Sequence, residues 1–150
     1  ACMIEAFPHI HSRTPHRPPS LQTLLGFDFG RQRIGVATGQ TITGTATALV
    51  SLESRNGRPD WDGISDLIGS WQPDALVVGL PLHADGSDSD ITTAARRFMR
   101  QLEGRYHLPV CGMDERLSSH TATGSGDARR RGMDAAAARI ILQDWLDTRT

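Results

Sequence analysis

The sequence predicts an α/β domain whose five-stranded mixed sheet has three antiparallel strands followed by two parallel ones and is flanked by helices. Two observations lead to this prediction. Short apolar runs typical of buried strands occupy 24–30, 33–39, 43–52, 75–79 and 108–113. From residue 61 on, apolar residues also recur at spacings of three and four, as on the buried face of a helix, in 61–71, 91–102 and 134–146.

The order of these segments predicts the topology of the sheet. The first three strands are joined by short turns near 30–32 and 39–42, so they form an antiparallel meander. Right-handed crossovers through helices then place the fourth and fifth strands parallel to the first. The carboxyl ends of the first and fourth strands flank the point where the chain order reverses, which is where open α/β sheets bind ligands.

Local signals predict the ends of the helices. Pro59 precedes the first helix and Pro73 follows it. Ser87 with Asp90 three residues later resembles a capping box at the start of the second helix. Gly104 is expected to end that helix.

Length and composition predict one domain with one hydrophobic core. The chain has 150 residues, of which 38% are hydrophobic. Residues 1–20 are rich in Pro and His and have no periodicity, so we expect a disordered tail followed by the domain at 21–150. The formal net charge of −1 argues neither for nor against a polyanionic partner, so local charge placement must decide that question.

The chain lacks the apolar segments that membrane targeting requires. It has no run long enough for the core of a signal peptide and no stretch of about 18 apolar residues. We therefore expect a cytoplasmic protein with no membrane partner.

Asp28 stands out because it interrupts the first apolar run. Leu25, Phe27 and Phe29 bracket it, and Gly30 permits the turn that follows. An ionised carboxylate buried without a partner costs more free energy than the packing of a strand returns. Asp28 should therefore be paired, lie at the end of its strand, or bind a metal ion.

Further carboxylates fall near the same edge of the predicted sheet. Asp114 and Glu115 end the last strand, and Asp134 precedes the last helix. Carboxylates brought close together repel unless a cation lies between them, and oxygen ligands favour Mg²⁺ or Mn²⁺. One or two such ions would suit phosphodiester hydrolysis. The alternatives are ordinary: Asp134 as an N-cap, which spacing alone favours, and Asp114 and Glu115 as ion-pair partners of Arg116.

Arginines divide into two groups by their expected surroundings. Those near the acidic residues are candidates for binding a nucleic-acid backbone: Arg31, Arg33, Arg116, Arg129, Arg130 and Arg131. Three of them lie in the polar segment 117–131, which is expected to be a mobile loop. The arginines of the second helix are expected to form a solvated face, and these are Arg96, Arg97, Arg100 and Arg105.

Four motifs in this order carry a resemblance to a known family. They are GFDFGRQRIGVA (26–37), VGLPLHADG (78–86), DERLSS (114–119) and DAAAARIIL (134–142). They resemble the YqgF family, also called RuvX, which are ribonuclease H-like proteins described as pre-16S rRNA nucleases or Holliday-junction-resolvase-like proteins. The resemblance covers about residues 22–147 and is more specific than any single motif.

The resemblance implies a ribonuclease H-like fold and a metal-dependent nuclease site. Asp28 would be the central metal ligand, Asp114 or Glu115 the second acid, and Asp134 the third, so the implied metal ligands are Asp28, Glu115 and Asp134. In contrast to true junction resolvases, the fourth strand ends at 79–81 without a carboxylate, so one acid must come from the fifth strand.

Several functions remain open at this point. The leading hypothesis is an endonuclease that uses Mg²⁺ or Mn²⁺ to process the 5′ end of precursor 16S rRNA, with the ribosome as a further partner. The alternatives are a Holliday-junction-type DNA resolvase and a nucleic-acid or ribosome-associated binding factor with weak or no nuclease activity. An ATPase related to the sugar kinases is disfavoured because it needs two lobes. The oligomeric state is left open.

Overall fold

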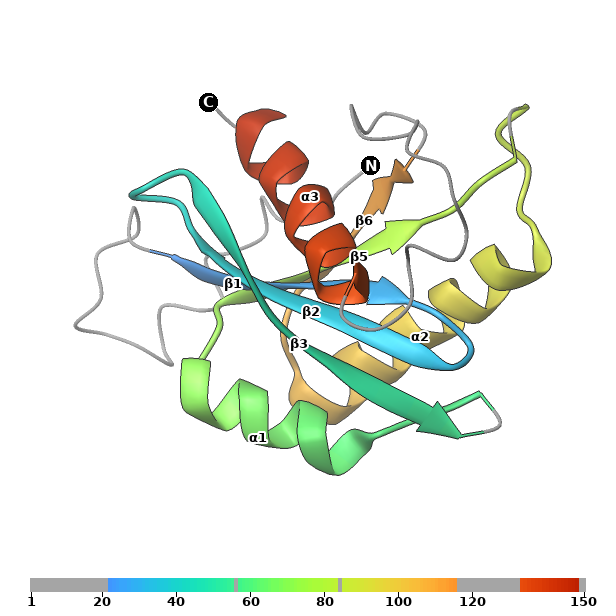
Figure 1. Cartoon of the computed structure of the whole chain (residues 1–150), viewed down its shortest axis with the longest axis horizontal. Coiled ribbons are helices and arrows are strands. Elements are labelled where there is room, and N and C mark those ends of the chain that lie inside the picture. The colour runs from blue at the N-terminus through green and yellow to red at the C-terminus, as the bar shows by residue number, and fades with distance from the viewer. Residues whose placement is uncertain (1–21, 56, 84, 116–132, 149–150) are drawn as a thin grey trace.

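The computed structural model describes residues 22–55, 57–83, 85–115 and 133–148, and every structural statement below concerns those residues. They form a six-stranded sheet with the order β4-β3-β2-β1-β5-β6 (Figure 1). The strands are β1 (Thr23–Phe29), β2 (Arg33–Gln40), β3 (Thr45–Arg55), β4 (Arg58–Pro59), β5 (Ala75–Leu80) and β6 (Val110–Asp114). The helices are α1 (Trp61–Trp71), α2 (Asp90–Tyr106) and α3 (Met133–Thr148). The predicted tail at 1–20 and the predicted loop at 117–131 lie outside the described residues.

The sheet has the predicted mixed topology. β1 pairs antiparallel with β2 and parallel with β5, and β5 pairs parallel with β6. The α/β class is thus confirmed, but the strand count was wrong, because β4 adds a sixth strand that pairs with the end of β3. A strand of two residues that ends in Pro59 is too short to show periodicity, and proline is tolerated at a sheet edge.

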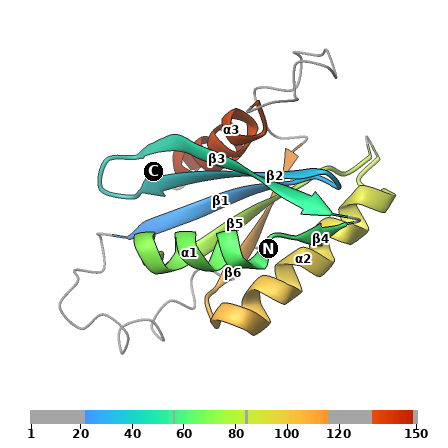
Figure 2. The same cartoon turned by 60° about the horizontal axis from the view of Figure 1, so that its bottom comes forward.

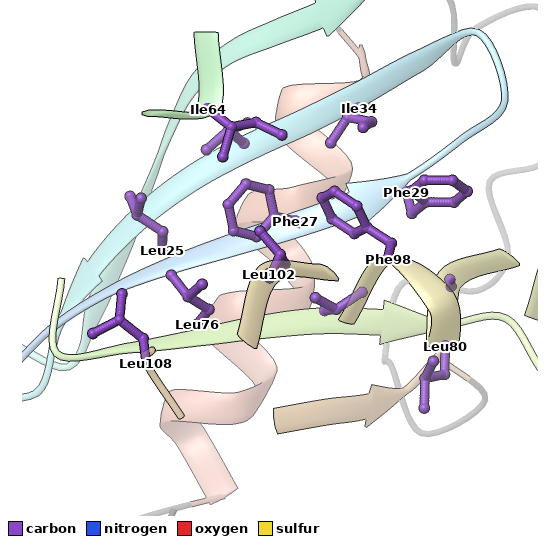
Figure 3. Close-up of a cluster of buried hydrophobic side chains, with 13 residues drawn as sticks. Leu25, Phe27, Phe29, Ile34, Ile64, Leu76, Leu80, Phe98, Leu102 and Leu108 are labelled. Carbon is purple, nitrogen blue, oxygen red and sulfur yellow. The ribbon is translucent and has the colours of Figure 1, made fainter. Parts of the chain in front are cut away.

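Helices cover both faces of the sheet. α3 lies on one face, and α1 and α2 lie on the other (Figures 1 and 2). The face under α1 and α2 carries large side chains, and Figure 3 shows the cluster that they form. Phe98 of α2 lies at its centre, with ring centroids 5.6 Å from Phe27 and 5.0 Å from Phe29. No helix in the described part of the chain is both long enough and apolar enough to cross a membrane.

The face under α3 carries glycine and alanine at several strand positions, beside larger side chains such as Leu24 and Met113. Ala37 and Ala75 are fully buried there. A Cβ atom added to Gly26 would lie 2.9 Å from the Cβ of Leu142 in α3. This helix therefore packs closer to the strands than large side chains would allow.

The ends of α2 differ from those predicted. Ser89, not Ser87, is the N-cap, and it forms a capping box with Thr92. The helix continues past Gly104 to Tyr106, and His107 adopts the left-handed conformation with φ 55° as its C-cap. Ser87 instead donates to Asp85 from its backbone N–H at 2.9 Å and from its hydroxyl at 2.6 Å. Both candidate caps lie two residues apart in one polar loop, so only the hydrogen bonds distinguish them.

Candidate active site

Asp28 lies on the α3 face of the sheet, near the carboxyl end of β1. Side chains alternate along a strand, so Asp28 shares its face with Leu24 and Gly26, which pack against α3. Gly35 of β2 is its direct neighbour in the antiparallel register. On the other side, the parallel register pairs Phe27 with Val78, which brings the next residues, Asp28 and Gly79, alongside each other. The half-buried Asp28 is therefore flanked by a glycine on each neighbouring strand.

Gly35 lets the first turn of α3 rest directly on β2. A Cβ atom added there would overlap the backbone carbonyl oxygen of Asp134. Asp134 is thereby fixed over the strand next to Asp28. Its carboxylate is turned toward β3, where the Ser51 hydroxyl donates to Oδ2 at 3.4 Å. Ser51 is the register partner of Gly35, so Asp134 lies above a row that runs from Ser51 through Gly35 to Asp28.

Gly79 makes room for the carboxylate of Glu115 on the other side of Asp28. A Cβ atom added to Gly79 would lie 2.7 Å from Oε2 of Glu115 and 2.5 Å from Cδ1 of Ile141 in α3. The Glu115 carboxylate therefore lies on the α3 face, above the strand beside Asp28. Gly35 and Gly79 thus have equivalent roles: Gly35 lies under the backbone of Asp134, and Gly79 lies under the carboxylate of Glu115.

Asp114 belongs to the opposite face. It is the register partner of Leu80, whose side chain belongs to the cluster under α2, and residues paired in a parallel sheet share a face. Met113, one residue earlier, lies on the α3 face. The structure thus brings Glu115 to the side of Asp28 and not Asp114, a choice that the sequence had left open.

Asp28, Glu115 and Asp134 lie near one end of the sheet, but their carboxylates do not converge on one position. Among the described residues, no three His, Cys, Asp or Glu side chains lie close enough together to hold one metal ion. The donor set is nevertheless oxygen only, as hard divalent cations require. Glu115 occupies space that a side chain at position 79 would fill, and Asp134 is turned to Ser51. The residues therefore fit a divalent ion by their donor chemistry, and metal binding stays a prediction.

The loop between β5 and α2, near the same end of the sheet, is tied to the helix. The Pro81 carbonyl accepts hydrogen bonds from Thr92 Oγ1 at 2.6 Å and Ser89 Oγ at 3.3 Å. Within the loop, the hydrogen bond from the Ser87 hydroxyl lowers the pKa of Asp85 below its ordinary value. These bonds fix how the chain leaves β5 beside the site.

The predicted substrate-binding arginines are only partly described. Arg31 is exposed in the turn between β1 and β2, and Arg33 is half-buried at the start of β2. Arg116 and Arg129–Arg131 lie outside the described residues. Sequence reasoning did not identify Gly35, Gly79 or Ser51, although glycine within a strand signals close approach by another group.

Known proteins resemble this chain closely. A family model described as "RuvX: Holliday junction resolvase" matches residues 22–148. A Pseudomonas fluorescens protein named "Putative pre-16S rRNA nuclease" is 48% identical over 136 residues, which are 85% of this chain and 94% of that protein. A protein of the same name from Pseudomonas putida is 49% identical over 138 residues, or 87% of this chain and 98% of that protein.

Solved structures resemble the fold. The structure titled "T. thermophilus RuvC in complex with Holliday junction substrate" has a TM-score of 0.51 and 14% identity, and the match covers 85% of this chain and 95% of that one. At this level of identity the likeness shows the fold alone, which is that of RuvC.

Proposed function

This chain belongs to the RuvX family, and on that premise we propose that it is a nuclease that hydrolyses phosphodiester bonds of precursor 16S rRNA at the 5′ end. The names of its relatives support this substrate. Its proposed setting is the cytoplasm, with the assembling ribosome as a further partner. One observation carries the proposal: Asp28 lies between two strand glycines over which Glu115 and the first turn of α3 approach.

The proposed site needs a divalent ion, Mg²⁺ or Mn²⁺. Asp28 and Glu115 would hold it, and Asp134 would complete the set once its carboxylate leaves Ser51. When bound, the ion supplies Lewis-acid chemistry at the phosphate and lowers the pKa of a water. Two carboxylates on one face also repel each other, so a cation between them is favourable.

The protein residues around this site have positioning roles in the proposal. Asp28 is held on a central strand with neighbours on both sides, which fixes its carboxylate better than a loop would. Gly35 fixes the height of Asp134 above the sheet, because the backbone of α3 rests on it. Arg31 and Arg33 flank the turn after Asp28 and would bind phosphates on either side of the scissile bond.

The test is cleavage of a 5′-extended 16S rRNA precursor with Mg²⁺ or Mn²⁺. Asp28→Asn and Glu115→Gln should each lower the rate at least about 100-fold, the order of loss when one electrostatic contributor to the transition state is removed. Asp114→Asn is the matched control, because it removes the neighbouring carboxylate on the other face of the sheet. Its rate should stay within about threefold of the wild type, well inside the effect expected of a group in the site.

A four-way DNA junction serves as the competing substrate in the same assay. Preferential cutting of the junction would replace the rRNA by branched DNA as the substrate. If the wild type and Asp28→Asn are equally inert on both substrates while binding persists, the chain is a binding factor and the nuclease proposal is wrong. An equal loss in Asp114→Asn and Glu115→Gln would contradict the assignment of the acids.

A further inference from the structure

A cleft with an arginine-rich rim opens on the side of the sheet opposite α3. Its volume is about 640 Å³. The arginines come from separate parts of the chain: Arg31 from the turn after β1, Arg58 from β4, and Arg97 and Arg105 from α2. Figure 2 shows α1, β4 and α2 together on that side, away from α3. The cleft therefore opens on the face of the sheet opposite the Asp28 carboxylate, and Arg31 is the residue that it shares with the proposed nuclease site.

One stripe of α2 forms a wall of the cleft. The residues that line it recur at spacings of three and four, so they lie on one side of the helix: Ala94, Arg97, Gln101 and Arg105. Arg96 and Arg100 lie on a neighbouring stripe and do not line the cleft. Arg96 instead pairs with Asp88, with 2.9 Å between Nε and Oδ2. The arginines of α2 therefore divide into two groups with different surroundings.

One arginine of the cleft lies over an aromatic ring. Phe29 and Trp61 both line the cleft. The Arg105 guanidinium lies 4.0 Å from the centroid of the Trp61 ring, a cation–π contact that holds it at the wall. The Trp61 ring in turn packs on Phe98 of the core, with centroids 5.7 Å apart. A positively charged groove with aromatic side chains in its lining is typical of sites that bind single-stranded nucleic acid.

The described lining of the cleft carries positive charge and no carboxylate. No Asp or Glu lines the cleft, and none of its arginines has an ion-pair partner in the described segments. The neighbouring carboxylates are Glu53 and Asp60, which line an adjoining hollow of about 340 Å³ that shares Arg58 and Pro59 with the cleft. Because the net charge of the chain is −1, this cluster is a local concentration and not a consequence of a basic protein.

We propose that this cleft binds the phosphodiester backbone of a single-stranded segment of the nucleic-acid substrate, away from the scissile bond. The proposal rests on the proposed function in taking the substrate to be nucleic acid. Arg31 connects the two sites, because it lies in the turn that joins the strand of Asp28 to the strand of Gly35. A nucleic-acid strand that leaves the Asp28 site across this turn reaches the cleft.

Binding of a labelled single-stranded RNA of about 12 nucleotides, followed by fluorescence anisotropy, tests this proposal. The full-length protein is used in EDTA, so that cleavage does not interfere. The double variant Arg97→Ala/Arg105→Ala should bind about tenfold more weakly. The slope of log K against log salt should fall by about 1.4, corresponding to two phosphate contacts on a single strand.

The double variant Arg96→Ala/Arg100→Ala is the matched control. It removes the same charge from the same helix but leaves the cleft lining intact. Its affinity should stay within about twofold of the wild type, because it loses no phosphate contact. Equal weakening of the two double variants would overturn the proposal, since general electrostatic attraction would then explain the binding. Thermal unfolding of each variant checks that the loss does not come from misfolding.

A competition experiment distinguishes a polymer from a small anion. Inorganic phosphate should displace the RNA no better than chloride does at equal ionic strength. Displacement by phosphate at low millimolar concentration would overturn the proposal in favour of a small-anion site. The two proposals can fail separately. If the wild type does not cleave RNA but Arg97→Ala/Arg105→Ala weakens RNA binding, only the nuclease proposal is wrong. Cleavage with unaltered RNA binding in Arg97→Ala/Arg105→Ala refutes only the cleft.

Discussion

The two faces of the sheet are built on opposite principles. Under α1 and α2, large side chains such as Phe27, Phe98 and Leu102 fill a thick apolar layer (Figure 3). Under α3, glycines let the helix approach so closely that Gly35 touches its backbone. The thick layer holds the fold together and supports the arginine-rich cleft at its rim. The thin layer has room for carboxylates, and Asp28 lies there.

This difference explains how one small domain tolerates a half-buried carboxylate on a central strand. On the thick face, a charge would have to be surrounded by hydrocarbon, at a large free-energy cost. On the thin face, Asp28 is flanked by Gly35 and Gly79, over which the backbone of α3 and the Glu115 carboxylate lie. The two faces should therefore be sensitive to opposite kinds of mutation. Removing side-chain volume should destabilise the thick face, and adding side-chain volume should destabilise the thin face.

The largest effect is expected from Phe98→Ala on the thick face. Phe98 is 1% exposed and packs on three other aromatic rings, so its removal leaves a cavity. The free energy of unfolding should fall by about 3–5 kcal/mol. Urea denaturation measures this value. A loss below about 1 kcal/mol would mean that this face is not the main source of stability.

The next effect is that of Gly35→Ala on the thin face. The new methyl group meets the backbone oxygen of Asp134, which has no rotamer to change, so the start of α3 must move. The expected loss is about 3 kcal/mol, the upper end of the range for overpacking. The same urea experiment applies. A stability equal to that of the wild type would show that α3 is not held against β2 as described.

Gly79→Ala should be milder for stability but not for activity. Its methyl group meets only side-chain atoms, Cδ1 of Ile141 and Oε2 of Glu115, which can rotate away. The free energy of unfolding should fall by about 1–2 kcal/mol. Because the Glu115 carboxylate is displaced, cleavage should fall more than the folded fraction does. Parallel losses of folding and of cleavage would remove Glu115 from the proposed site.

Gly69→Ala gives the smallest effect and has the opposite sign. Gly69 lies in α1, and a Cβ atom added there would meet nothing within 4 Å. Alanine should therefore stabilise the protein by about 0.5–1 kcal/mol through the intrinsic preference of the helix. Thermal unfolding detects this gain. A loss instead would show that the chain penalises added methyl groups in general, which would weaken the interpretation of Gly35.

Periodicity predicted most of the fold because each buried face repeats along the sequence. The strands, the helices and the parallel placement of β5 and β6 followed from it, and the structure confirms them. The errors are local. β4 is too short to have a period, and the cap of α2 depends on whether Ser87 or Ser89 meets the helix.

The candidate site was predictable in residue type but not in geometry. Asp28 was recognisable because a carboxylate interrupts an apolar strand. Choosing between Asp114 and Glu115 as the acid beside Asp28 required the position of α3. Alternation of side chains along the strand puts the two residues on opposite faces, but it does not say which face α3 covers. The cleft could not be predicted without the tertiary structure, because Arg31, Arg58 and Arg97 come from distant parts of the chain.

The sequence by itself therefore determined the elements and the unusual acid, because local patterns of polarity act within a few residues. Tertiary structure alone decided which face α3 covers, that Gly35 and Gly79 lie on either side of Asp28, and that arginines from distant segments share one cleft. The physical reason is that these relations depend on contacts between strands and helices far apart in the chain. Those contacts form only when the helices pack on the sheet, α1 and α2 through large side chains and α3 through close approach to the strands.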